Sequence, residues 1–186
     1  MRHFLFFGIM GTRYFRDYVT YSLENCGGGI MNVLFIHQNF PGQFRHLASH
    51  FASSQGNKVI GICQPHAPGI RDRQFSTILK SVYQPHRKPS RTIHPYLLNV
   101  ENHLLNGQGS ARVLLDLKKK GFNPDPAFAH IGWGEALYFK DIFPDVPLVG
   151  YCEFYYHGNG ADLDFDPQFP ATVDDREPAR GMLPNL

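Results

Sequence analysis

The chain has 186 residues, which is enough for one ordinary domain with its own hydrophobic core and argues against a two-domain enzyme. Its composition, 42% hydrophobic and 18% charged residues, is typical of globular proteins, and no apolar run reaches the ~18 residues of a membrane span; this excludes membrane-spanning, collagen-like and wholly disordered chains. Eighteen Lys and Arg against sixteen Asp and Glu leave a net charge of +2, too small to indicate a nucleic-acid binder.

The beginning of the chain differs in character from the rest. A short apolar patch at residues 4–10 is followed at once by Arg13 and Arg16, without the small residues of a signal-peptide cleavage site. We therefore expect residues 1–30 to be a poorly ordered leader or mis-started extension. The predicted organisation continues with a domain over residues 31–172 and an irregular tail over residues 173–186.

The first element expected inside this domain is a buried strand at residues 31–37, which read MNVLFIH. Turn and cap residues follow at 38–43, and apolar residues then recur from Phe44 to Phe51 at the spacing of an amphipathic helix. A second apolar run at 58–63 predicts another buried strand. Together these elements form a βαβ unit, whose two strands are parallel.

Prolines punctuate the middle of the chain, where residues 64–92 give only weak strand signals near 77–79 and 82–83. A long helical pattern then runs from Tyr96 to Lys120. Further elements are expected as a strand at 126–131, a short helix at 135–141 and a strand at 146–152. This alternation predicts an α/β fold with a Rossmann-like, doubly wound and mainly parallel sheet.

Neither the cysteines nor the histidines indicate a metal site. Cys26, Cys63 and Cys152 have no CxxC spacing, so the sequence signals no disulfide framework and no zinc site. His46 and His50 are helix-spaced but lack the glutamate of a metalloprotease helix and a third ligand. We expect reduced thiols in a cytoplasmic protein and no bound metal.

In an open α/β sheet, ligands bind at the carboxyl ends of the strands, where loops meet helix N-termini. The loop at residues 37–43 occupies such a position. Gly42 allows a ligand to approach the backbone, and His37, Asn39 and Gln43 can donate hydrogen bonds. A plain turn with a helix N-cap explains the same residues equally well.

A second candidate position follows the strand at 126–131. His130 lies at the strand end, Gly132 and Gly134 clear space, and Glu135 opens the next helix. These residues suit hydrogen bonding or proton chemistry on a ligand hydroxyl. The plainer alternative is a buried histidine satisfied by the backbone, with Trp133 in the core.

The residues after the last expected strand offer Glu153 beside aromatic rings such as Tyr155, which suits stacking on sugars and hydrogen bonding to their hydroxyls. A polar rim over an aromatic core explains them nearly as well. Gly132 and Gly134 with Glu153 also match part of a dinucleotide fingerprint, but Leu137 replaces its third glycine. The sequence has no serine nucleophile elbow, no P-loop and no paired carboxylates at a catalytic spacing. This disfavours a self-contained hydrolase or kinase.

Two motifs are long and specific: HQNFPGQF at residues 37–44 and HIGWGE at residues 130–135. With MNVLFI before the first motif, HPY at the entry to the long helix and EFYY after the last strand, the sequence resembles the N-terminal domain of a group of family 4 glycosyltransferases. The resemblance covers residues 31–172. It implies one half of a GT-B fold, in which two Rossmann-like domains face each other across a cleft, with retention of anomeric configuration and no required metal.

The resemblance also implies roles for individual residues. His130 is the expected catalytic residue, in contact with hydroxyls of the sugar near the reacting centre. Asn39, Pro41, Gly42 and Gln43 are expected to face the donor's diphosphate or the transferred sugar. The expected acceptor-side residues are His37, Gly132, Trp133, Gly134, Glu135, Glu153 and Tyr155.

The function implied is that of the acceptor-side half of a retaining glycosyltransferase. It would move a sugar from a nucleotide-sugar co-substrate, with no other cofactor, to a carbohydrate or lipid-linked acceptor, with peripheral contact at the inner face of the membrane. A C-terminal domain would hold most of the nucleotide sugar, so little turnover is expected from this chain alone. The alternative is a non-catalytic carbohydrate- or nucleotide-binding module or a truncated remnant. We also expect the face toward the second domain to leave aromatic residues such as Trp133 partly exposed.

Overall fold

The computed structural model describes residues 4–7, 29–152, 166–172 and 174. Within these residues, six strands form one sheet in the order β1-β6-β5-β2-β3-β4, and every neighbouring pair is parallel. The strands are β1 (Phe4–Phe7), β2 (Asn32–Ile36), β3 (Lys58–Cys63), β4 (Leu79–Val82), β5 (Ala127–His130) and β6 (Leu148–Tyr151).

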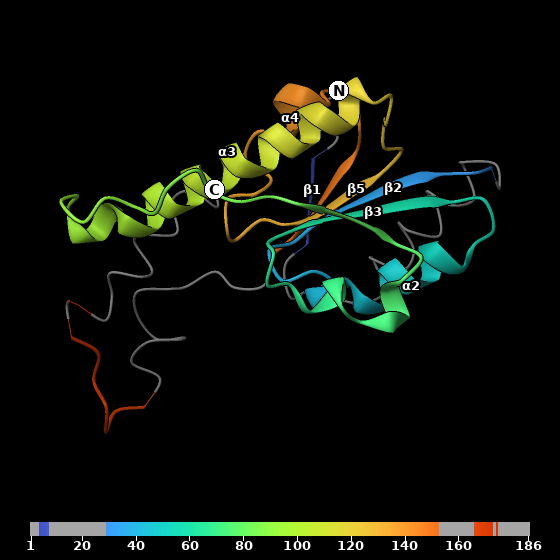
Figure 1. The fold of residues 1–186 in the computed structure, drawn as a ribbon. Helices are drawn as coiled ribbons and strands as arrows, with labels where there is room; N and C mark the ends of the chain where they lie inside the picture. The colour runs from blue at the N-terminus through green and yellow to red at the C-terminus, as the bar shows by residue number, and fades with distance from the viewer. Residues whose placement is uncertain (1–3, 8–28, 153–165, 173, 175–186) are drawn as a thin grey trace.

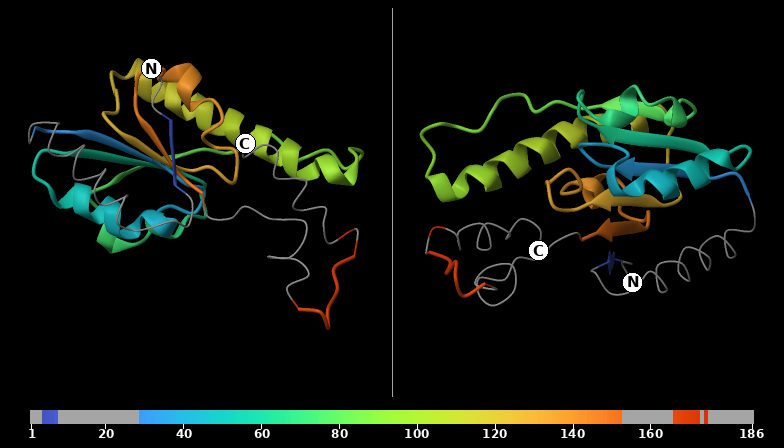
Figure 2. Two further views of the ribbon diagram at one scale, coloured as in Figure 1. Left: turned by 180° about the vertical axis from the view of Figure 1, so that it is seen from behind. Right: turned by 90° about the horizontal axis from the view of Figure 1, so that it is seen from below.

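Helices cover both faces of the sheet, as Figures 1 and 2 show. Helix α2 (Arg45–Ser53) lies on one face, and α3 (Leu98–Lys119) lies on the other together with the short α4 (Phe139–Ile142). Short 3-10 turns occur at Gly42–Phe44, Pro68–Ile70, Arg73–Phe75 and Pro95–Leu97. The predicted α/β, doubly wound, parallel architecture is confirmed.

The central strand β2 shows why helices must pack on both faces of the sheet. Val33 and Phe35 point into the core beneath α2, whereas Leu34 and Ile36 point into the core beneath α3, and all four side chains are fully buried. Successive side chains of a strand alternate between faces, so a strand that is apolar at every position is stable only between two layers. The continuous apolar run in the sequence is therefore the signature of a central parallel strand.

Aromatic rings fill the core on the α2 face. The Phe35 ring stacks on Phe128 of β5, with centroids 5.2 Å apart, and is also in contact with the rings of Phe40, Phe44 and Phe51. On the other face, Leu114 of α3 packs with residues of α4 and of the sheet. Each helix is thus attached to the sheet by burial of its apolar side.

Two elements differ from the sequence prediction in their limits. The weak strand signals near 77–79 and 82–83 correspond to one edge strand, β4, in which Leu79 and Val82 are exposed. The helix expected at 135–141 begins only at Phe139, because the preceding residues form turns around Gly134.

Part of the segment at residues 1–30, which the sequence predicts to be a leader, contributes a strand to the sheet. Phe4–Phe7 form β1, which pairs in parallel with β6 through the register Phe4 to Leu148 and Phe7 to Tyr151. Four consecutive apolar residues suit a short strand at the edge of a sheet. Residues 8–28 and 175–186 lie outside the described part of the chain, and the remaining domain boundaries stay a prediction.

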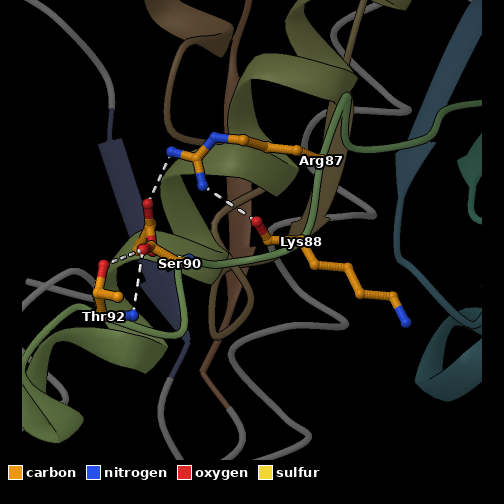
Figure 3. A network of polar contacts seen from close by, with 5 residues as sticks. Arg87, Lys88, Ser90 and Thr92 are labelled. Atoms are coloured by element: carbon orange, nitrogen blue, oxygen red, sulfur yellow. Dashed lines mark hydrogen bonds and ion pairs between the residues drawn. The ribbon is translucent and has the colours of Figure 1, made fainter.

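A polar network fastens the segment between β4 and α3 to that helix. The Arg87 guanidinium lies 2.7 Å from Glu101 Oε1, and the Ser90 backbone N–H donates to Glu101 Oε2. Figure 3 shows the same segment, in which Arg87 donates to the Lys88 carbonyl and the Ser90 and Thr92 hydroxyls lie 2.9 Å apart. The hydrogen bond from Ser90 and the neighbouring guanidinium lower the pKa of Glu101.

A helix that crosses a bilayer needs about 20 consecutive, mostly apolar residues. In the described part of the chain, no helix combines the length and the apolar character that a membrane crossing requires.

Candidate functional site

The site begins at the point where the strand order reverses. From β2 the chain proceeds outward to β3 and β4 on one side, and it then returns to place β5 and β6 on the other side of β2. Because all strands are parallel, the carboxyl ends of β2 and β5 lie side by side at one edge of the sheet. In open α/β sheets this topological switch point is where ligands bind.

Both predicted histidines lie at this position. His37 directly follows β2, and His130 is the last residue of β5; their imidazole rings lie 5.1 Å apart at 72°. His37 is 4% exposed and His130 is 3% exposed. The two motifs, separated by about ninety residues in the sequence, are therefore brought into contact by the pairing of two neighbouring strands.

The loop after β2 wraps around the His37 ring. The Asn39 backbone N–H donates to His37 Nδ1 at 2.9 Å, and His37 Nε2 lies 2.7 Å from Gln43 Oε1. An accepting Nδ1 places the proton of the neutral ring on Nε2, which then donates to Gln43. Asn39, Gly42 and Gln43 are exposed, so the loop presents polar groups outward and buries the histidine behind them.

Gly42 is required by this loop. Its φ of +48° lies in the left-handed region, and a Cβ there would come within 2.5 Å of His37 Nε2. Pro41 precedes it as a buried residue, and the Phe44 backbone N–H donates to the Pro41 carbonyl at 2.9 Å. The sequence therefore specifies a tight turn, as the plain interpretation expected, and the turn also exposes two polar side chains.

His130 is held by its own following turn. The Gly132 backbone N–H donates to His130 Nδ1 at 3.1 Å, and the Trp133 indole stacks over the imidazole at 5.9 Å with planes 21° apart. Tyr151 of β6 lies on another side of the ring, also at 5.9 Å. Burial and a backbone hydrogen bond match the plain alternative for His130. Trp133 does not match it, because 40% of this residue is exposed.

Gly134 sets the close approach of this turn to α3. Its φ is +89°, and a Cβ would lie 2.2 Å from the His103 carbonyl oxygen. From the opposite side, a Cβ on Gly107 of α3 would lie 2.7 Å from the Gly134 carbonyl oxygen. The two glycines that flank Trp133 therefore serve different purposes, since Gly132 leaves room for the His130 ring and Gly134 leaves room for a helix.

Glu135 lies elsewhere than the sequence suggested. It is 1% exposed, and the Tyr83 hydroxyl donates to its Oε1 at 2.5 Å. Desolvation by burial raises the pKa of Glu135 to about 7 and raises the pKa of Tyr83 above its usual value. The carboxyl of Glu135 is therefore buried against Tyr83, and its expected acceptor contact stays a prediction.

Several polar residues at this edge escaped the sequence analysis. Gln64 Nε2 donates to Tyr83 Oη and to Asn106 Oδ1, and Asn106 Nδ2 donates to the Trp133 carbonyl at 3.1 Å. His66 also belongs here, since its Nε2 lies 2.9 Å from Asn39 Oδ1. Gln64 and His66 could have been found from their position just after β3. Asn106 could not, because its spacing within a long helix gives no signal of a site.

Two predicted residues cannot be placed. Glu153 and Tyr155 lie outside the described residues, as does Cys26, and their roles stay predictions.

Among the residues that the structure describes, no group of three or more His, Cys, Asp or Glu side chains could hold a metal ion. Cys63 is a buried thiol, and burial raises its pKa to about 11.

The family follows from comparison with known proteins. A model of the glycosyl transferase family 4 group matches residues 55–182. The chain belongs to this family. The match includes His130 to Glu135 and begins after the Asn39 to Gln43 loop, so the second motif lies inside it and the first lies outside it.

Comparison with curated proteins gives no match for this family 4 chain. Among solved structures, it is similar to the calicheamicin glycosyltransferase CalG4 at 16% sequence identity and a TM-score of 0.41. The alignment covers 75% of this chain and 34% of CalG4, so the chain spans about a third of the length of that protein.

Proposed function

We propose that this family 4 chain forms the acceptor-side half of a GT-B glycosyltransferase, which transfers a sugar from a nucleotide sugar to a carbohydrate or lipid-linked acceptor with retention of configuration. The observation that carries the proposal is the contact between His37 and His130 at the switch point of the sheet. A second domain would hold most of the nucleotide, and the reaction would take place in the cytoplasm at the inner face of the membrane.

The exposed groups around the histidine pair suit a sugar or a diphosphate. Asn39 and Gln43 offer amide groups on one side, and the partly exposed Trp133 offers an aromatic face on the other. Sugars combine hydroxyls that need hydrogen bonds with C–H faces that pack on aromatic rings. In this proposal the ligand lies between the loop and the indole and contacts His130, which is 3% exposed.

The proposal is tested by binding of a panel of nucleotide sugars to the whole chain, measured by calorimetry. Because a second domain would hold most of the nucleotide, we expect one nucleotide sugar to bind weakly but measurably to this chain. His130→Ala should weaken that binding by about tenfold or more, as expected for the loss of one hydrogen bond to a charged or strongly polar group. His50→Ala is the matched control, because His50 is an exposed histidine in the last turn of α2 and should leave the affinity unchanged.

Two results would contradict the proposal. Equal affinities of the His130→Ala and His50→Ala variants would remove His130 from the site. Binding of free carbohydrates or nucleotides, with no binding of nucleotide sugars and no transfer to any acceptor, would favour the alternative of a non-catalytic binding module.

A further inference from the structure

A buried polar network lies behind the loop that carries Trp133. It consists of the half-buried Gln64 after β3 and the buried Tyr83 after β4, Asn106 on α3 and Glu135 in the turn after β5, and we call these four residues the buried network. Their side chains are joined by hydrogen bonds of 2.5 to 3.2 Å from Glu135 through Tyr83 and Gln64 to Asn106. Four separate elements thus meet in one chain of polar contacts at the carboxyl edge of the sheet.

The buried network ends on the backbone of Trp133. Asn106 Nδ2 donates to the Trp133 carbonyl at 3.1 Å, and Glu135 is two residues further along the same turn. Between them, Gly134 lies so close to α3 that no side chain fits. The orientation of the Trp133 peptide group is therefore fixed from both sides.

Stability alone gives a poor account of these residues. Glu135 is 1% exposed and Asn106 is 2% exposed, and Glu135 Oε2 has no hydrogen-bond partner among the described residues. Burial of polar and ionisable groups costs free energy that apolar side chains of similar volume would avoid. A network of this kind is better explained by the geometry that it imposes than by the stability that it adds.

We propose that Gln64, Tyr83, Asn106 and Glu135 are positioning residues, which hold the Trp133 indole over His130 and thereby place the aromatic wall of the sugar site. The buried network thus positions the stacked indole of Trp133, a residue that is 40% exposed. The part of this inference that concerns ligand binding rests on the proposed function. The part that concerns the position of Trp133 holds for the free protein and can be tested without a ligand.

The chain contains one tryptophan, so its intrinsic fluorescence reports on Trp133 directly. Asn106→Ala removes the hydrogen bond to the Trp133 carbonyl. We expect this variant to shift the emission to longer wavelength and to make Trp133 more accessible to acrylamide quenching. Ser110→Ala is the matched control, because Ser110 is buried on the same helix and its Oγ has no partner among the described residues. This control should keep the wild-type emission.

Two further variants protect the test against a simple loss of folding. Tyr83→Phe keeps the ring and removes only the hydroxyl, so it should reproduce the effect of Asn106→Ala in a milder form. Glu135→Gln keeps an oxygen that accepts from Tyr83, so it should keep the wild-type emission. Circular dichroism of each variant verifies that the fold is retained.

The ligand measurement separates the two proposals. With the nucleotide sugar that the wild type binds, Asn106→Ala should weaken binding by about tenfold while Ser110→Ala does not. If no nucleotide sugar binds to the wild type, the proposed function fails, and the emission of the free variants still decides the role of the buried network. Wild-type emission and quenching in both Asn106→Ala and Tyr83→Phe would overturn the inference.

Discussion

At Gly134 the backbone lies against α3 with no room for a side chain. The effect of adding a side chain there can be compared with the effect at a glycine in open space. Gly121 has a similar φ of +82°, but nothing lies within 4 Å of a Cβ built on it. We expect Gly121→Ala to lower the free energy of unfolding by about 1 kcal/mol, the cost of the left-handed backbone.

Gly134→Ala should cost about 3 kcal/mol or more, because the added methyl group also meets the His103 carbonyl and must displace the turn or the helix. Urea unfolding of both variants measures the difference. Equal losses in the two variants would show that the turn at Gly134 moves freely away from α3.

Glu135 makes the stability depend on pH in an unusual direction. Because burial raises its pKa from 4.5 to about 7, the folded state binds a proton more tightly than the unfolded state does. The stability that this group contributes is fully present below about pH 4.5 and is lost as the pH rises through 7. Desolvation lowers the pKa of the nearby His103, and this histidine acts in the opposite direction.

We therefore expect Glu135→Gln to be more stable than the wild type at pH 8, and the gain should shrink toward pH 5. A shift of this size corresponds to at most about 3 kcal/mol. Urea unfolding of both proteins at the two pH values measures the gain, and the contributions of the histidines cancel in the comparison. A gain that is the same at both values would contradict a buried, protonated Glu135.

At the scale of elements, one aromatic side chain of β2, Phe35, packs against both α2 and β5. Phe35 is fully buried and touches four other phenylalanine rings. Phe35→Ala should lower the free energy of unfolding by about 3–5 kcal/mol, since it removes the buried ring and leaves a cavity. Leu115→Ala on the exposed side of α3 is the control, with an expected change within about 0.5 kcal/mol. Similar melting temperatures of the two variants would contradict this account of the core.

The sequence was most informative where a local pattern determines an element. Residues 58–63 and the helix after Phe44 were predicted almost to their ends, because burial on two faces or on one side leaves a clear periodicity. The histidine pair was also predictable, since both residues follow apolar runs. Tyr83, Gln64 and Asn106 were missed because their hydrogen bonds join distant segments and leave no periodic trace. The burial of Glu135 could not be predicted either, because its exposure depends on how closely Gly134 approaches α3.

At the scale of the whole molecule, the sheet extends beyond the strands that the motifs predicted. Among the described residues, β1 adds a sixth strand beside β6 and becomes one edge of the sheet, while β4 forms the other. Both edge strands have only four residues, and short edges limit pairing with other chains. The candidate site lies near the middle of this sheet, where two flanking strands on either side hold the ends of β2 and β5.

The pairing of β2 with β5 also affects how the protein folds. The Asn32 backbone N–H donates to Asp125 Oδ2 across 93 positions of the chain, and the two histidines meet across the same long loop. We expect contacts of this kind to form late, because the entropy cost of closing the loop must be overcome before they stabilise the fold. We therefore expect the histidine pair to come together only in a late cooperative step of folding.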